Sequence, residues 1–198
     1  MFHLFSAARH ILSGFSRSEM LYCTPARRPC LNDLAVVPEH QLPQLVRESA
    51  ATLRYIQLLG QLDWMHFPEK PGKRIWPDFP SIPFSAFAAA CLVKIDQKLV
   101  YMSDLRQYLA ENPALLWALG FPLVKSGNFS WGFDAEASLP TERHFCRLLR
   151  LMPHKALGYL LNESVHRIQT KLSGEVDDFG QAISLDTKHI IAWVIENN

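Results

Sequence analysis

Two groups of residues have side-chain types and spacings that could bind ions or charged ligands. The first is centred on a single acid, Asp186. The stretch AISLDTKHIIAWV places Asp186 between two apolar runs, 182–185 and 190–194. These runs are rich in β-branched residues, so we expect a strand ending at Asp186, a turn through Thr187 and Lys188, and an antiparallel return. A carboxylate at the end of a buried strand is costly unless it accepts hydrogen bonds or binds a cation. Asp186 is therefore a candidate metal ligand, and a purely structural role is the alternative.

The second group is a set of arginines in the segment PTERHFCRLLRLMPHK. Arg143, Arg147 and Arg150 are four and three residues apart, which places them within roughly 60° of one another on a helix. Guanidinium groups on one face can donate to phosphate oxygens, and Lys155 extends the positive charge. We therefore predict a DNA-contacting helix face, and a merely solvated face is the alternative. Four apolar residues are expected on the opposite face: Phe145, Leu148, Leu149 and Met152.

The cysteines offer a third candidate site. Cys23 and Cys30 are the only close pair among the four cysteines, and no second Cys or His pair follows at zinc-finger spacing. A metal site built from Cys23, Cys30 and His40 is the least favoured function class. Free thiols in a reducing compartment are the expectation.

The composition suits a folded core but does not identify a partner. Hydrophobic residues make up 48% of the chain, and 20 Lys and Arg nearly balance 19 Asp and Glu. Any basic surface must therefore be local. No run approaches the roughly 20 apolar residues of a membrane span, so no membrane association is expected.

Helical patterns dominate the elements that would position these residues, so the predicted fold class is mainly α. Ser103 is a candidate N-cap, Pro113 a helix start and Gly120 a helix end. The segment 67–84 is too rich in proline for a helix or a central strand, and its Trp76 and Phe79 would pack on a helical surface. Between Phe121 and Ser138 we expect an irregular loop. Helices are predicted over 39–62, 83–100, 103–111, 113–119, 140–152 and 153–173.

Four regions follow from this pattern. Residues 1–38 combine several prolines with no sustained periodicity and should be poorly structured. Residues 39–173 form a helical, DNA-associated region, in which 103–111, 113–119 and the arginine helix could build a helix-turn-helix-like module. A turn-rich connector covers 174–181, and the β pattern occupies 182–198.

Three stretches together resemble the N-terminal half of a bacterial insertion-sequence transposase of the DDE type: DLRQYLAENPALLWALGF (104–121), SLPTERHFCRLLRLMP (138–153) and ISLDTKHIIAWVIENN (183–198). The resemblance covers roughly residues 39–198. It implies a helical region followed by the first strands of an RNase H-like catalytic domain. It also implies that Asp186 corresponds to the first of three metal-binding acids that hold Mg²⁺.

The other two acids of that family lie on later elements, so we expect a catalytically incomplete chain. The resemblance implies a prokaryotic cytoplasmic protein that binds double-stranded DNA at transposon ends and could form homo-oligomers. Arg143, Arg147, Arg150, Lys155 and Lys188 are the candidate DNA contacts. The alternative is a non-catalytic α-helical module that binds a protein partner or a second copy of itself.

Overall fold

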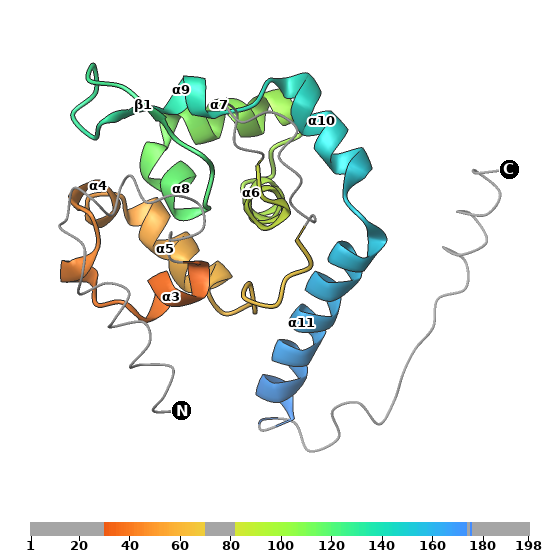
Figure 1. The fold of residues 1–198 in the computed structure, drawn as a ribbon. Helices are drawn as coiled ribbons and strands as arrows, with labels where there is room; N and C mark the ends of the chain where they lie inside the picture. The colour runs from red at the N-terminus through yellow and green to blue at the C-terminus, as the bar shows by residue number, and fades with distance from the viewer. Residues whose placement is uncertain (1–29, 70–81, 174, 176–198) are drawn as a thin grey trace, which may run out of the picture. The chain divides into compact units, whose positions relative to one another are not determined.

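Helices account for nearly all the regular structure in this computed structural model, which describes residues 30–69, 82–173 and 175 (Figure 1). Within those ranges the only sheet is an antiparallel pair in which Val124 faces Asp134 and Lys125 faces Phe133. The mainly α prediction is therefore confirmed. The first elements in chain order are α3 (Leu31–Val36), the 3-10 helix η1 (Glu39–Gln41), α4 (Gln44–Arg47), α5 (Ala50–Leu59), α6 (Phe84–Asp96) and α7 (Met102–Glu111).

The second half contains the only strands and the longest helix among the described residues. The chain divides into two units between Leu160 and Leu161, so the last helix begins in the first unit and continues into the second. The remaining elements are α8 (Pro113–Ala118), β1 (Val124–Lys125), β2 (Phe133–Asp134), α9 (Ala135–Ser138), α10 (Glu142–Leu151) and α11 (His154–Leu172).

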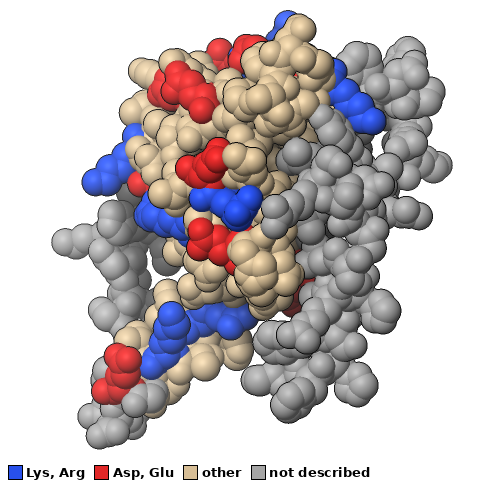
Figure 2. Space-filling model, turned by 90° about the vertical axis from the view of Figure 1, so that its left-hand side faces the viewer, with Lys and Arg blue, Asp and Glu red and all other residues tan. Residues whose placement is uncertain are grey.

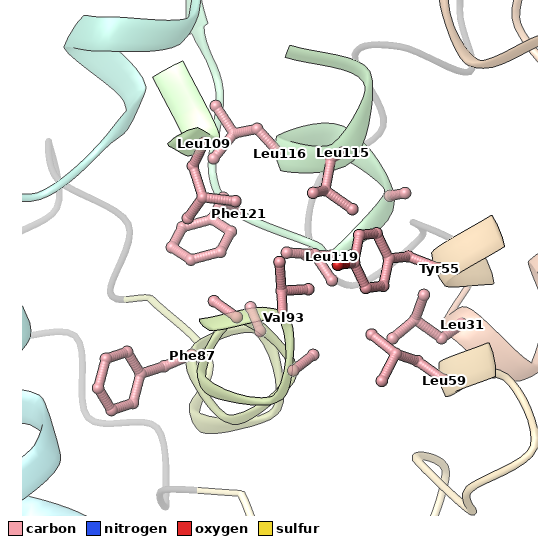
Figure 3. Packing of buried hydrophobic residues seen from close by; sticks show 14 of the residues in the cluster. Leu31, Tyr55, Leu59, Phe87, Val93, Leu109, Leu115, Leu116, Leu119 and Phe121 are labelled. Carbon is pink, nitrogen blue, oxygen red and sulfur yellow. The ribbon is translucent and has the colours of Figure 1, made fainter. Parts of the chain in front are cut away.

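The core of the first unit surrounds α6, which is seen end-on in Figure 1 with α5, α7, α8 and α10 around it. Its run of alanines lets neighbouring helices approach closely, while Phe87 and Val93 fill the remaining space with no exposed surface. Figure 3 shows Val93 directed toward Leu119 and Tyr55, which come from other elements. Four large residues on or next to α8 are also buried: Leu115, Leu116, Trp117 and Leu119.

Several helix ends follow the sequence signals. Pro113 is the first residue of α8, and Gly120 follows that helix with φ of +89°, a left-handed conformation that glycine adopts without strain. The predicted cap at Ser103 is wrong, because Tyr101 is the N-cap of α7. The Tyr101 N–H donates to Oδ2 of Asp104 at 2.9 Å, so the acid in the first turn satisfies an otherwise unpaired donor.

Other elements differ from the prediction. The helix expected over 39–62 is broken into three, because Pro43 precedes α4 and Ser49 starts α5 by accepting from the Thr52 N–H at 3.3 Å. Residues 31–36 form α3 although they belong to the segment expected to be poorly structured. The supposed irregular loop 121–138 contains β1, β2 and α9. Residues 1–29, Trp76, Phe79 and the connector other than Glu175 lie outside the described residues.

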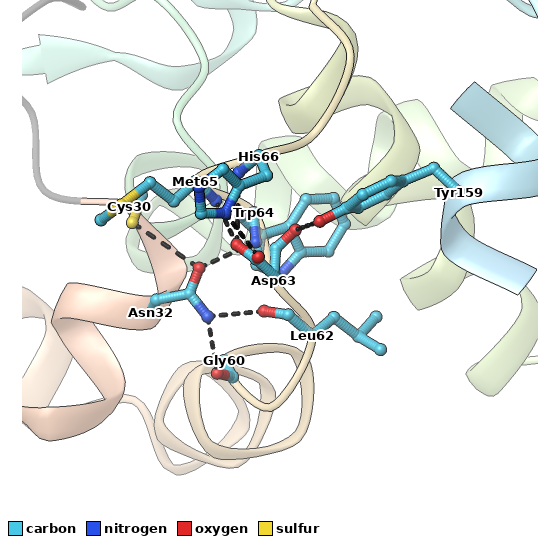
Figure 4. A network of polar contacts seen from close by, with 9 residues as sticks. All are labelled: Cys30, Asn32, Gly60, Leu62, Asp63, Trp64, Met65, His66 and Tyr159. Atoms are coloured by element: carbon cyan, nitrogen blue, oxygen red, sulfur yellow. Dashed lines mark hydrogen bonds and ion pairs between the residues drawn. The ribbon is translucent and has the colours of Figure 1, made fainter. Parts of the chain in front are cut away.

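A single side chain joins α3 to the turn after α5 (Figure 4). Nδ2 of Asn32 donates to the carbonyls of Gly60 at 2.9 Å and Leu62 at 2.5 Å, and its Oδ1 accepts from the Trp64 N–H at 2.8 Å. The Tyr159 hydroxyl donates to the Asp63 carbonyl at 2.8 Å, which attaches the first turns of α11 to the same turn. These bonds satisfy carbonyls that the end of α5 leaves unpaired.

An ionic cluster joins α5 to the end of α6. The Arg54 guanidinium donates two hydrogen bonds to the Asp96 carboxylate, at 2.8 and 2.9 Å, and the Tyr55 hydroxyl donates a third at 2.6 Å. These bonds favour the charged carboxylate and lower the pKa of Asp96 to about 2. Burial and the neighbouring Asp96 raise the pKa of Tyr55 to about 12.

Replacing Asp96 by asparagine should weaken the acid dependence of stability. Because the folded pKa of about 2 lies below the value of roughly 3.9 in an unfolded chain, this carboxylate stabilises the fold fully above about pH 4. The contribution is lost as pH falls toward 2. Urea midpoints measured between pH 2 and 5 should therefore fall less steeply for Asp96→Asn than for the wild type. Equal slopes would contradict the assignment.

Candidate nucleic-acid interface

The arginine helix is α10, and its start is well defined. Thr141 precedes it, and the Thr141 hydroxyl accepts from the His144 N–H at 3.4 Å. Glu142 lies in the first turn and Arg150 in the last, which places each charge where the helix dipole favours it. The sequence therefore favours this helix before any tertiary contact is made.

One aromatic side chain holds α10 against the core. Phe145 has no exposed surface, stacks on Phe87 with ring centroids 5.7 Å apart, and meets the edge of Phe121 at 6.2 Å. Leu148 and Met152 are also buried, as predicted. Leu149 was predicted on the same face but is 47% exposed, so the buried face is narrower than expected. Helix packing on α7 and α6 covers the Phe145 side and does not extend around to Leu149.

The three arginines occupy the outer face of this helix. Arg143, Arg147 and Arg150 are all exposed, and no hydrogen bond or ion pair to them is found within the described residues. Lys155, in the first turn of α11, is also exposed. The predicted group of cations is therefore brought together on α10, with donors available to a partner.

The charge elsewhere in the first unit is mixed. Figure 2 shows a face on which Lys and Arg side chains are interspersed with Asp and Glu. Some charged side chains of the first unit are paired; Arg106, for example, donates to Glu136 at 2.5 Å. On that face neither sign of charge gathers into a patch of its own, in agreement with a net charge of only +1 for the chain.

The helix-turn-helix-like arrangement lacks its short turn. The segment between α8 and α10 holds the β1–β2 pair and α9, so the two helices are not joined by the three or four residues that such a motif uses. α7 does pack against both α8 and α10. The described elements therefore do not form the helix-turn-helix-like module that was predicted, although α10 packs on the same helical core.

A surface cavity beside α10 was not predicted from the sequence. It has a volume of about 730 Å³ and lies against α7, with Arg106, Phe129, Trp131 and Glu142 among its lining residues. Phe129 stacks on Trp131 with ring centroids 5.3 Å apart. Aromatic residues in a glycine-containing segment were the available signal, but only the fold brings them beside α7.

The candidate metal ligands are not brought together in the described part of the chain. Asp186 and Cys23 lie outside it, as does Lys188, which was predicted as a DNA contact. Burial raises the pKa of the Cys30 thiol, which disfavours the thiolate that a metal would require. Residues 30–69, 82–173 and 175 contain no group of three His, Cys, Asp or Glu side chains placed to hold a metal.

Comparisons with protein-family models, with curated proteins and with solved structures find no match to this chain. A search of the described helices also finds none with the length and apolar character needed to cross a bilayer. The arrangement of side chains on α10 is therefore the main basis for a functional proposal.

Proposed function

We propose that this chain is the DNA-binding N-terminal part of a DDE-type transposase, and that α10 contacts DNA phosphates through Arg143, Arg147 and Arg150. The supporting observation is that α10 has one face buried in the core and an opposite face that carries exposed arginines. Phe145 is fully buried, while the three guanidinium groups are exposed and have no partner within the described residues. Phosphates are the ligands that a row of planar, permanently charged donors fits well.

Contacts of this kind give affinity without base recognition. Each phosphate that a protein neutralises releases condensed counterions, so the logarithm of the binding constant falls by about 0.9 per contact for each tenfold rise in salt. Three contacts from α10 predict a strong salt dependence on any duplex. Sequence preference for transposon ends requires residues beyond this helix face.

The role proposed for Asp186 is metal binding, which differs from the phosphate contacts of the arginines. By the resemblance it is the first metal-binding acid of an RNase H-like domain whose opening strands would occupy 182–198, with Mg²⁺ as the ion. Two-metal phosphoryl transfer needs several converging carboxylates, which Asp186 alone does not supply. We therefore propose DNA binding as the function and assign no strand cleavage or joining to Asp186 by itself.

The test is a triple substitution, Arg143→Ala, Arg147→Ala and Arg150→Ala, measured by fluorescence anisotropy on a labelled 20-base-pair duplex. At about 0.1 M salt, affinity should fall roughly 100-fold or more, since three charge-assisted hydrogen-bonded contacts are removed. The salt slope should also fall by about three. Circular dichroism should be unchanged, because all three side chains are exposed.

A charge-matched control shows whether affinity depends on this helix face or only on the overall charge of the protein. Lys98→Ala, Arg167→Ala and Lys171→Ala remove the same net charge from exposed positions outside α10. This control should keep most of the affinity and slope. If it weakens binding as much as the α10 variant does, α10 is not the interface.

A helical interaction module without DNA binding is the second candidate. It is supported by exposed aliphatic side chains on α11, including Leu161 at 64% and Ile168 at 54%. Large exposed apolar groups in a row commonly indicate a contact surface. A mobility-shift assay together with sedimentation would separate the two functions, because the module should associate without DNA.

A further inference from the structure

The second half of α11 carries an apolar row that the described residues do not cover. We call it the α11 stripe and define it as Leu161, Val165, Ile168 and Leu172. Their spacing of four, three and four residues puts them within roughly 60° of one another around the helix. Leu161, Val165 and Ile168 are 64%, 44% and 54% exposed, and Leu172 is half-buried. Such a row is costly in water unless something covers it.

The stripe is not a continuation of the face that α11 buries in the first unit. Ala156 and Leu160 are the buried residues of its first turns. At 100° per residue their mean direction is roughly 130° from that of the stripe. The helix therefore has two separate apolar faces. A chain segment or a partner other than the core of the first unit must cover the stripe.

A second copy of the helix is a weak candidate for that occupant. A two-stranded coiled coil needs apolar spacing sustained over about three or four heptads. The stripe extends over little more than two, even when it is continued to Leu157, which is 47% exposed on the same face. Stable interfaces between separate chains engage about 20–30 residues on each side. Four aliphatic residues are far fewer.

The chain itself provides a better candidate. Residues 182–195 begin ten positions after Leu172 and contain the apolar runs Ala182–Leu185 and Ile190–Ile195. The stripe is about 16 Å long, because a helix rises 1.5 Å per residue, and about five residues of extended chain cover that distance. The nine residues 173–181, between the end of α11 and that segment, are long enough for the chain to reverse direction. Attachment to the same chain gives an effective concentration in the millimolar range, so a small apolar contact suffices.

We infer that the α11 stripe is the docking surface for residues 182–195 of the same chain. Ile168, at the centre of the stripe, is covered by aliphatic side chains of that segment. The assignment does not depend on DNA binding by α10, since the stripe and the arginines lie on different helices.

Photocrosslinking of the full 198-residue chain tests this inference. p-Benzoylphenylalanine in place of Ile168 keeps an apolar side chain at the stripe and inserts into nearby C–H bonds under light. Peptide mass spectrometry should locate the new bond within residues 182–195 of the same chain, with the protein still monomeric on a denaturing gel. Binding to duplex DNA should be unchanged in this variant, so a failure here is distinguishable from a failure of the proposed function.

The same photoprobe in place of Gln169 is the matched control, because that exposed residue is adjacent in sequence but about 100° further around the helix. It should give at least tenfold less product with 182–195. A crosslink from position 168 to α11 of a second copy would overturn the inference in favour of a dimer. A crosslink elsewhere in the chain, equal products from both positions, or no product would also overturn it.

Discussion

Replacing Phe145 by alanine should lower the free energy of unfolding by about 3–5 kcal/mol, the usual cost of truncating a fully buried phenylalanine. The ring has no exposed surface and contacts two other rings, those of Phe87 and Phe121. Its loss would leave a cavity between α10 and the core that these neighbours cannot fill without moving α6. Urea unfolding followed by circular dichroism measures the change directly.

Leu149→Ala is the control for this prediction. It lies on the same helix and is also a large apolar residue, but it is 47% exposed, so it should cost less than about 1.5 kcal/mol. Equal losses for the two variants would mean that Phe145 does not hold α10. In the folded fraction, Phe145→Ala should weaken DNA affinity while leaving the salt slope near the wild-type value, because all three arginines remain.

Replacing Gly60 by alanine should destabilise the protein by about 3 kcal/mol, the upper end of the usual cost of overpacking. A Cβ at this position would lie 2.4 Å from Cβ of Ala35 and 2.9 Å from the Leu31 carbonyl oxygen, both on or next to α3, and 2.6 Å from the Ile56 carbonyl. Backbone atoms cannot move aside as a flexible side chain can, so α3 must separate from α5. Separation would also break the Asn32 bonds to Gly60 and Leu62.

Gly158→Ala gives the opposite expectation and serves as the control. Gly158 lies inside α11, and an added Cβ would meet nothing within 4 Å. Alanine there should stabilise the protein by roughly 0.5–1 kcal/mol, because glycine is a poor helix former. Thermal unfolding of the two variants should therefore shift in opposite directions. A Gly60→Ala variant as stable as the wild type would show that α3 is not packed so closely on α5.

Some elements of this structure could be predicted from local signals in the sequence. Pro113 and Gly120 define α8 through backbone restrictions that act within a few residues. The arginine spacing in α10 was also readable, since residues three and four apart share a helix face whatever surrounds them. The apolar run of α6 likewise predicted a helix, over 83–100, from residues close together in the sequence.

Long-range contacts determine what the sequence did not reveal. The six-residue α3 has no helical periodicity to detect, and it depends on packing Leu31 and Leu34 against α5. The Asn32 bonds join groups about 30 positions apart. Leu149 has the right spacing for burial, but among the described residues no element covers its side of α10.

The start of α6 has a consequence for the order in which the protein folds during synthesis. Pro83 precedes this helix and has no side-chain acceptor, so the Glu69 carboxylate takes its place by accepting from the N–H groups of Phe84 at 2.8 Å and Ser85 at 2.9 Å. Glu69 leaves the ribosome before α6 does, because chains emerge from their N-terminal end. The central helix can therefore be capped as soon as its first turn emerges, before α7, α8 and α10 exist to pack around it.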